Sequence, residues 1–301
     1  MKILITDGMD KSAIAALKEK GHEITEQFYA PEELGQALRD FDAVVIRSAT
    51  KIRKAQLDIA KGSKLKLIIR GGVGVDNIDV ADAESMGIAV RNTPNASSNA
   101  VAELAIGLMF SCARYISIAG HTMRENKWEK KVYGKGFELH GKTLGVIGYG
   151  RIGKRIGDIA QAIGMKVVAY QRHPKPEYEC DTMHFVSLDQ LLAGADVIAL
   201  STPSLGAPII NGENIGKMKD GVVIINTSRG GNVDEDALLA ALNSGKVRAA
   251  GLDVWAQEPT KNEALYCHPA VSCTPHIGAS TSEAQKRIGA EIVAIIDSHN
   301  G

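Results

Sequence analysis

The sequence has few of the features that would mark a metal site, a disulfide framework or a base-stacking surface. Its four cysteines in 301 residues, Cys112, Cys180, Cys267 and Cys273, form neither a CxxC pair nor a Cys/His spacing suited to zinc. Free thiols in a chain of this length are typical of a reducing compartment, and we expect no metal. Aromatic residues make up 5% of the chain, which disfavours stacking on nucleic-acid bases.

Net charge and long apolar runs are also missing. The 35 Lys and Arg residues balance 35 Asp and Glu residues, so the formal net charge is zero and any anion site must be local. The first apolar run, residues 3–5, is too short for a signal peptide, and residues 104–113 reach only about half a membrane span. We therefore expect a cytoplasmic protein without nucleic-acid or membrane partners.

Glycine, by contrast, is abundant, and the chain is long enough for two domains. Its 31 glycines in 301 residues favour many tight turns between strands and helices. Continuous apolar runs, typical of parallel strands covered on both faces, alternate with helical patterns. The predicted strands are residues 3–5, 43–46, 67–69 and 88–90 in a first series, and 144–147, 167–169, 197–200, 222–225 and 249–252 in a second.

This alternation predicts an α/β protein with two doubly wound parallel sheets. Helical patterns at 12–20 and 31–39 connect strands of the first series. Residues 99–114 are apolar nearly all round and predict a helix buried in a domain joint or a subunit interface. The helical pattern at 282–296 has no strand to join, so we expect it to pack on the first domain. The predicted domains are residues 1–98 with 283–301, and residues 99–282.

The segment Gly148-Tyr149-Gly150-Arg151-Ile152-Gly153 fits the glycine pattern of a dinucleotide-binding turn. It follows the apolar run 144–147 and opens a helical pattern. The first glycine allows a tight turn, the second lets a pyrophosphate approach the backbone, and the third lets the helix pack on the strand. The N-terminal end of the helix attracts phosphates. We therefore expect a dinucleotide site here.

The residues after the next predicted strand bear on the choice between NAD and NADP. An acid that hydrogen-bonds the adenosine ribose normally stands here, but this chain has Gln171 followed by Arg172. Gln171 does not repel a 2′-phosphate, and Arg172 would attract one. Alternatively, Arg172 is a solvated surface residue and Gln171 serves NAD by hydrogen bonding. The sequence leaves the preference open.

Three segments cluster polar residues immediately after strands, where ligands of open α/β sheets bind. Residues 226–231, 253–259 and 274–279 contain Arg229, Glu258 and His276 in turn. Hydride exchange between a 2-hydroxy acid and a 2-keto acid requires a histidine to move the proton, an acid to support it and an arginine to bind the carboxylate. Each residue alone also has a structural explanation, as a core histidine, a turn acid or a surface ion pair.

The chain resembles the D-isomer-specific 2-hydroxyacid dehydrogenases over nearly its whole length. Besides the glycine pattern and the three polar segments, the likeness lies in residues 45–51, 70–77, 92–95 and 127–129. It implies a flavodoxin-like substrate domain, a Rossmann nucleotide domain and a substrate cleft between them. It also implies hydride transfer between 3-phospho-D-glycerate and NAD or NADP, the first step of serine biosynthesis, with Arg229, Glu258 and His276 as catalytic residues.

The resemblance further implies the binding residues. The expected cofactor contacts are Gly148, Gly150, Arg151, Ile152, Gly153, Gln171, Arg172, Thr202, Pro203, Thr227, Asp253, His276 and Gly278. The expected substrate contacts are Arg47, Arg70, Val73, Gly74, Arg229 and His276. Arg47 and Arg70 would neutralise a substrate phosphate, although an ion pair at a strand end is the alternative for Arg47. Family members pair through residues 99–120, which implies a homodimer in which Lys130 or Lys131 reaches the partner's site.

The chain departs from the family pattern at Gln171 and at Ser201, where many relatives have a histidine. It ends at Gly301, from which we expect no C-terminal serine-sensing domain.

Two alternative functions remain. One is a reductase of hydroxypyruvate or glyoxylate, or another D-2-hydroxyacid dehydrogenase. The other is a nucleotide-sensing protein similar to the transcriptional corepressors that resemble this family.

Overall fold

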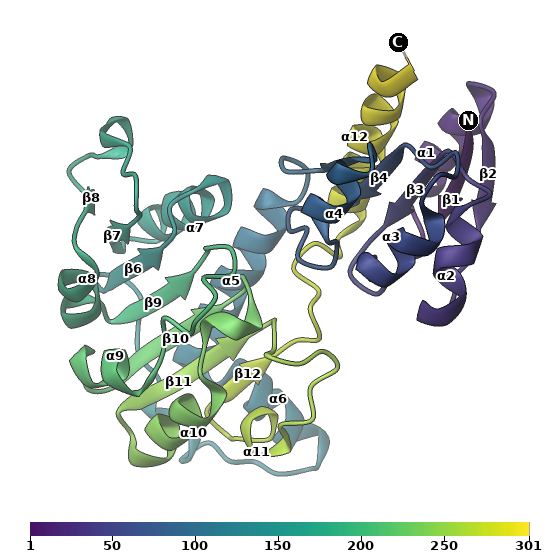
Figure 1. Cartoon of the computed structure of the whole chain (residues 1–301). Coiled ribbons are helices and arrows are strands. Elements are labelled where there is room, and N and C mark those ends of the chain that lie inside the picture. The colour runs from purple at the N-terminus through teal and green to yellow at the C-terminus, as the bar shows by residue number, and fades with distance from the viewer. Residues whose placement is uncertain (301) are drawn as a thin grey trace. The chain divides into compact units, whose positions relative to one another are not determined.

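A computed structural model describes residues 1–300, and the chain divides into two units. Unit 1 consists of residues 1–98 together with the chain from Ala279 onwards, and unit 2 consists of residues 99–278. Each unit contains one sheet in which neighbouring strands are parallel (Figure 1). The predicted α/β class with two doubly wound parallel sheets is confirmed.

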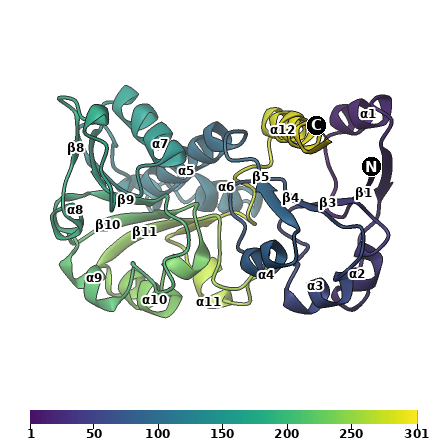
Figure 2. The same ribbon diagram turned by 45° about the horizontal axis from the view of Figure 1, so that its top comes forward.

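Unit 1 is a five-stranded sheet in the order β2-β1-β3-β4-β5, the flavodoxin-like order. Helices α2, α3 and α4 cover one face, and α1 and α12 cover the other (Figure 2). The elements are β1 (Lys2–Ile5), α1 (Lys11–Glu19), β2 (Glu23–Glu26), α2 (Pro31–Leu38), β3 (Ala43–Ile46), α3 (Lys54–Ala60), β4 (Leu67–Arg70), α4 (Val80–Ser85), β5 (Ala89–Asn92) and α12 (Ser282–Asn300).

The last helix completes the core of unit 1. Ile288, Ile292 and Ile296 of α12 recur every fourth residue and are buried against Ile3 and Ile5 of β1. Full burial of such a side chain contributes about 1.5–3 kcal/mol. The expected boundary after residue 282 lies four residues beyond the observed one. The reason is local, since Ala279 packs on this core and its carbonyl accepts a hydrogen bond from Gln285 Nε2 at 2.7 Å.

Unit 2 is a seven-stranded sheet in the order β12-β11-β10-β9-β6-β7-β8. Helices α5 and α7 pack on one face, and α8, α9, α10 and α11 on the other (Figure 2). The strands are β6 (Thr143–Ile147), β7 (Lys166–Tyr170), β8 (Met183–Phe185), β9 (Val197–Leu200), β10 (Val222–Asn226), β11 (Val247–Leu252) and β12 (Val271–Cys273). The α-helices are α5 (Ser98–Arg114), α6 (Ile116–Arg124), α7 (Arg151–Ala162), α8 (Leu188–Gly194), α9 (Gly212–Lys217), α10 (Glu235–Ser244) and α11 (Glu263–Tyr266), and the short 3₁₀ segments are η1 (Tyr133–Lys135), η2 (Pro176–Tyr178) and η3 (Gly230–Asn232).

The strand order of unit 2 places the ligand-binding edge of its sheet. The chain starts in the middle, at β6, moves outward through β7 and β8, and then returns to build β9 to β12 on the other side of β6. In such doubly wound sheets, ligands bind beyond the carboxyl ends of the strands, where the direction of winding reverses. The turn after β6 therefore lies at the reversal, and the ends of β9 to β12 follow along the same edge.

Helix α5 is mostly buried, as its apolar sequence predicts. Ten of its residues are buried, whereas Glu103, Gly107, Phe110 and Arg114 lie along one exposed stripe. Within residues 1–300 no single helix is long and apolar enough to cross a membrane. Helices α5 and α6 reach that length only as a pair, and the chain bends by 67° between them.

Three strands were missed by the sequence prediction, and all three lie at edges of the sheets. They are β2, β8 and β12. The β2 sequence is Glu-Ile-Thr-Glu and none of its residues is fully buried, whereas β8 and β12 have only three residues each. Edge strands are short and polar because one side of each is unpaired, so they lack the continuous apolar run of a central strand.

Candidate active and cofactor site

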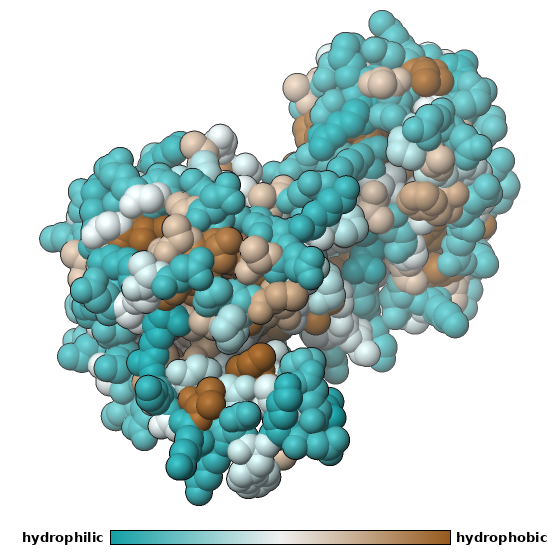
Figure 3. Space-filling model, turned by 90° about the horizontal axis from the view of Figure 1, so that it is seen from below, coloured by the Kyte–Doolittle hydropathy of each residue, from teal (hydrophilic) through white to brown (hydrophobic). Residues whose placement is uncertain are grey.

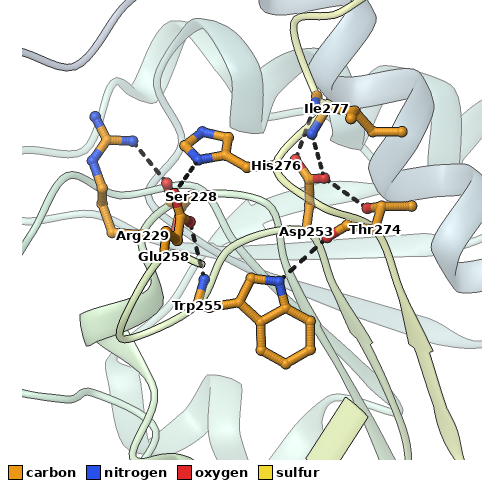
Figure 4. Close-up of polar contacts among 9 residues, drawn as sticks. Ser228, Arg229, Asp253, Trp255, Glu258, Thr274, His276 and Ile277 are labelled. Atoms are coloured by element: carbon orange, nitrogen blue, oxygen red, sulfur yellow. Dashed lines mark hydrogen bonds and ion pairs between the residues drawn. The ribbon is translucent and has the colours of Figure 1, made fainter. Parts of the chain in front are cut away.

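The three candidate catalytic residues follow three neighbouring strands of unit 2. Arg229 comes after β10, Glu258 after β11 and His276 after β12. Because these strands are parallel and adjacent, their carboxyl ends meet at one edge of the sheet. The three side chains gather there in one cluster (Figure 4). The structure thus brings together the residues that sequence spacing left apart.

Glu258 and His276 form a hydrogen-bonded pair. Glu258 Oε2 lies 2.7 Å from His276 Nδ1, and both side chains are 35% exposed. The second carboxylate oxygen, Oε1, accepts the backbone N–H of Trp255 at 3.2 Å. Partial burial raises the pKa of Glu258, but hydrogen bonding to His276, the charge of that ring, the Trp255 N–H and the charge of Arg229 together lower it below its ordinary value. Glu258 is therefore an anion at neutral pH.

Arg229 is held against the Glu258 loop by backbone contacts. The next residue, Gly230, packs so closely on Trp255 that a Cβ atom would lie 1.9 Å from the Trp255 carbonyl. Only glycine fits at this contact. Asn226, 1% exposed, donates from Nδ2 to the Arg229 carbonyl at 2.9 Å, and its Oδ1 accepts the Ser228 N–H at 3.0 Å. The turn that carries Arg229 is thus held in place by hydrogen bonds to Asn226, the last residue of β10.

Asp253 organises the turn that carries His276. Its buried carboxylate accepts hydrogen bonds from Thr274 Oγ1 at 2.6 Å and from the N–H groups of Ile277 and Gly278 at 2.8 and 2.9 Å (Figure 4). Its backbone carbonyl accepts the His276 N–H at 2.8 Å. His276 has a φ of 54°, a left-handed conformation that is uncommon for a histidine and needs such support.

The glycine turn between β6 and α7 fits a dinucleotide. Gly148 has a φ of 91°, and a Cβ atom at Gly153 would lie 2.1 Å from the Gly148 carbonyl oxygen, so both positions require glycine. At Gly150 nothing lies within 4 Å of a Cβ position, which leaves open space for a pyrophosphate. Gly150 is the N-cap of α7 and has no side chain to occupy the first N–H groups. Arg151 and Ile152 are the first two residues of that helix.

Gln171, directly after β7, is tied to the glycine turn. Its Oε1 accepts the Tyr149 N–H at 3.0 Å, and its Nε2 donates to the His173 carbonyl at 2.7 Å. In related folds an acid at this position hydrogen-bonds the adenosine ribose. Here the Gln171 amide instead hydrogen-bonds the backbone of the glycine turn. Arg172 is exposed beside it.

The remaining expected cofactor residues follow the strands beyond β6. Thr202 and Pro203 follow β9, and their carbonyls accept hydrogen bonds from Asn232 Nδ2 at 3.3 and 3.2 Å. Thr227 is buried at the end of β10, and Gly278 ends the histidine turn. All of these lie along the same edge of the unit 2 sheet as the glycine turn.

The expected substrate residues of unit 1 cluster at the ends of β3 and β4. The Arg47 N–H donates to Asp7 Oδ2 at 2.6 Å, and the Arg47 carbonyl accepts from Asn77 Nδ2 at 2.7 Å. The guanidinium of Arg70, at the end of β4, packs on the backbone of the loop that follows and donates from Nη1 to the Gly71 carbonyl at 3.2 Å. That loop continues to Val73, 37% exposed, and Gly74. Lys130 and Lys131 belong to unit 2, where both are exposed.

Several residues that shape the site were given no individual role by the sequence analysis. Asn226, Asn232 and Trp255 are buried or nearly so, and each hydrogen-bonds a loop that carries a candidate residue. Only the position of Asn226 could have indicated its role, because it is the single polar residue of β10 and ends that strand. The partners of Asn232 lie about thirty residues earlier in the chain, which local sequence does not reveal.

Known proteins share this architecture. A model of the "D-isomer specific 2-hydroxyacid dehydrogenase, NAD binding domain" matches residues 106–278. A hydroxypyruvate reductase from Thermotoga maritima is 47% identical over 298 residues, covering 97% of this chain and 96% of that protein. A D-3-phosphoglycerate dehydrogenase from Methanocaldococcus jannaschii is 44% identical over 293 residues, covering 96% of this chain, which spans only 55% of that protein's length.

Solved structures agree with the sequence matches. A D-lactate dehydrogenase from Aquifex aeolicus, complexed with NAD and lactic acid, is 29% identical and has a TM-score of 0.87, with 99% of this chain and 95% of that chain covered. The family model alone spans more than half of the 301 residues. The protein is therefore an oxidoreductase that uses NAD or NADP and belongs to the D-isomer specific 2-hydroxyacid dehydrogenases.

Proposed function

We propose that the protein transfers a hydride between C2 of 3-phospho-D-glycerate and a nicotinamide cofactor, with 3-phosphohydroxypyruvate as the keto acid. The observation that carries this proposal is the 2.7 Å pair of Glu258 Oε2 and His276 Nδ1, with Arg229 beside it on the neighbouring loop. A histidine, an acid and an arginine in this arrangement can move a proton and hold an α-keto or α-hydroxy carboxylate.

The roles of the residues follow from this geometry. Glu258 engages Nδ1 of His276, which leaves Nε2 to take the C2 hydroxyl proton during oxidation and to return it during reduction. The anionic Glu258 stabilises the imidazolium that forms. Arg229 binds the substrate carboxylate. A nicotinamide dinucleotide held at the glycine turn, residues 148–153, would supply the hydride acceptor for C2 in oxidation and the hydride donor in reduction.

The phosphate assignment depends on Arg47 and Arg70. They end adjacent strands of unit 1, since Arg70 pairs with Ile46, the residue before Arg47. A guanidinium group can donate two parallel hydrogen bonds to a phosphate dianion, so either arginine suits this role chemically. The hydrogen bonds of Arg47 to Asp7 and Asn77 are made by its backbone, so they do not occupy its guanidinium.

A second candidate, reduction of hydroxypyruvate, is favoured by a different observation. The Thermotoga maritima hydroxypyruvate reductase is similar to this chain over nearly the full length of both proteins. Hydroxypyruvate has the same carbon skeleton without the phosphate, so the Glu258–His276 pair would serve either acid. The two candidates differ only in whether a phosphate is bound.

The first test is turnover on a panel of acids with each cofactor. With 3-phosphohydroxypyruvate, hydroxypyruvate, glyoxylate and pyruvate, we expect the highest kcat/KM for the phosphorylated acid. His276→Ala should lower kcat about a hundredfold or more, because proton transfer is lost, while NADH binding followed by fluorescence stays close to wild type. Preference for hydroxypyruvate would favour the second candidate. A wild-type protein that binds NADH but reduces no 2-keto acid would instead support a nucleotide-sensing role.

The second test concerns the phosphate. Arg47→Ala should raise KM about tenfold or more for 3-phosphohydroxypyruvate, because a charge-assisted hydrogen bond is lost, and should change KM for hydroxypyruvate little. Lys51→Ala is the matched control, since it removes the same charge from an exposed position near the same turn. Equal effects of Arg47→Ala on both substrates would contradict the phosphate assignment.

For the cofactor, we propose that the protein accepts both NADP and NAD. Gln171 carries no charge to repel a 2′-phosphate, and Arg172 is exposed directly after it. The bonds from Tyr149 and to His173 fix the Gln171 amide in place. The end of β7 therefore presents a neutral amide and a cation to the ribose.

Changing Gln171 to Asp should separate the two cofactors. The new carboxylate repels a 2′-phosphate but can accept a hydrogen bond from the ribose hydroxyls of NAD, so kcat/KM for NADP should fall about tenfold or more while that for NAD is kept. Arg172→Gln should also lower kcat/KM for NADP selectively. Parallel losses for both cofactors, measured by initial rates at a fixed substrate concentration, would contradict this assignment.

We further propose that two copies of the chain pair through residues 99–120. The exposed stripe of α5 includes Phe110, 38% exposed; α6 adds Ile116 and, three residues past this range, Met123, each 58% exposed. On the face of unit 2 that is turned to the viewer in Figure 3, apolar residues lie interspersed with hydrophilic ones. A group of exposed apolar side chains on adjoining helices is typical of a surface that another chain covers.

Light scattering after size exclusion tests this pairing. We expect a mass of 64.2 kDa, twice the 32.1 kDa of one chain. A Phe110→Asp and Met123→Asp double variant should shift the mass to that of one chain, because two carboxylates would be buried in the interface. Phe28→Asp, at a residue of unit 1 that is 60% exposed, is the control and should leave the mass unchanged. A wild-type mass of one chain would overturn the proposal.

A further inference from the structure

Glu235 connects helix α10 to the loop that carries Glu258. It is the first residue of α10 and is partly buried. Its Oε1 accepts the Ala256 N–H at 2.8 Å, and its Oε2 accepts a hydrogen bond from Asn262 Nδ2, also at 2.8 Å. The two partners stand on either side of Glu258 in the sequence, so one carboxylate fixes both ends of the loop.

The position of Glu235 suits this task. A carboxylate in the first turn of a helix interacts favourably with the helix dipole, and hydrogen bonds to a carboxylate are stronger than those between neutral groups. Asn262 also caps α11, where its Oδ1 accepts the Leu265 N–H at 3.3 Å. The loop is thereby attached to the starts of two helices, α10 directly and α11 through Asn262.

The Glu258 loop needs such an attachment. Inside the loop, Glu258 is held through its own carboxylate, by the Trp255 N–H and by His276. These two contacts form only while the backbone keeps Glu258 at the correct distance. If the Ala256 N–H and the Asn262 amide lose their acceptor, the loop regains conformational freedom, and a misplacement of about 1 Å is enough to weaken a catalytic contact.

We infer that Glu235 is a positioning residue for the catalytic pair: it holds the backbone of residues 256–262 so that Glu258 stays hydrogen-bonded to His276. The inference rests on the proposed roles of Glu258 and His276. Among residues 1–300, the hydrogen bonds of the Glu235 side chain go to Ala256 and Asn262, so it acts on the reaction only through the loop.

The pH profile of keto-acid reduction provides the readout, because reduction requires the protonated His276. The charged groups that face the catalytic pair are Arg229 on the neighbouring loop and Asp253, whose carboxylate is taken up by the histidine turn. Glu258→Gln removes the anion, disfavours protonated His276 and should move the alkaline half-activity point about one pH unit lower. A positioning role predicts that Glu235→Ala shifts it in the same direction.

The experiment compares Glu235→Ala, Glu258→Gln and the double variant with wild type, using the keto acid that wild type reduces best. We expect Glu235→Ala to lower kcat about tenfold and to shift the half-activity point, and the double variant to show little more than Glu258→Gln alone, because both changes act on one contact. The matched control is Asp236→Asn, which alters the exposed acid next in the same helical turn and should leave the profile unchanged.

A pair of conservative variants separates positioning from a general loss of stability. In Glu235→Gln, the new amide oxygen still accepts the Ala256 N–H, but the new amide N–H₂ faces the N–H₂ of Asn262, so two donors meet. Adding Asn262→Asp places a carboxylate oxygen opposite the new N–H₂ and keeps a second oxygen to cap α11. The double variant should therefore have the pH profile of wild type. A purely structural role would lower Tm without moving the half-activity point.

Three results would overturn the inference. In one, the Glu235→Ala profile superimposes on that of wild type while Glu258→Gln shifts. In another, the half-activity point of the double variant moves by the sum of the shifts of Glu235→Ala and Glu258→Gln. In the third, Asn262→Asp fails to rescue Glu235→Gln although the double variant has the wild-type Tm. If Glu258→Gln itself leaves the profile unmoved in an active enzyme, the proposed role of Glu258 fails first, and the role of Glu235 fails with it.

Discussion

The geometry of the site depends on one buried carboxylate, that of Asp253. At 1% exposure it meets three donors, and its own carbonyl takes a fourth hydrogen bond from the His276 backbone. A carboxylate buried without such partners would cost several kcal/mol, so the histidine turn and Asp253 stabilise each other. The contacts of Asp253 with this turn go to Thr274 and to backbone N–H groups, so they leave the imidazole of His276 to Glu258 and the substrate.

Parallel strand order explains how residues far apart in the sequence reach one place. β10, β11 and β12 lie side by side, and each contributes one catalytic candidate at its carboxyl end. Their loops then support one another: Gly230 lets the arginine turn contact Trp255, and Trp255 donates from its N–H to Glu258 and from Nε1 to the Thr274 carbonyl. Because the loops after β10, β11 and β12 contact one another, the conformational freedom of each loop is reduced.

The sequence predicted the architecture well because central strands have a plain signature. β3 and β9 are four-residue apolar runs that are buried throughout, and the glycine spacing of residues 148–153 marked the turn after β6. The edge strands β2, β8 and β12 and the boundary at Ala279 carry no such signal. Adjacency of Arg229, Glu258 and His276 followed from family resemblance, since periodicity does not give strand order. Contacts such as that of Glu235 with Asn262, 27 residues away, depend on the fold itself.

The discontinuous course of unit 1 has a consequence for its folding during synthesis. The strands of its sheet lie within the first 92 residues, yet one face of that sheet is closed by Ile288, Ile292 and Ile296. A chain emerging from the ribosome at about 5–20 residues per second exposes this apolar face until α12 appears, roughly 10–40 seconds later. Unit 2 needs no later segment for its own core. The unit whose strands are made first is therefore the last to complete its core.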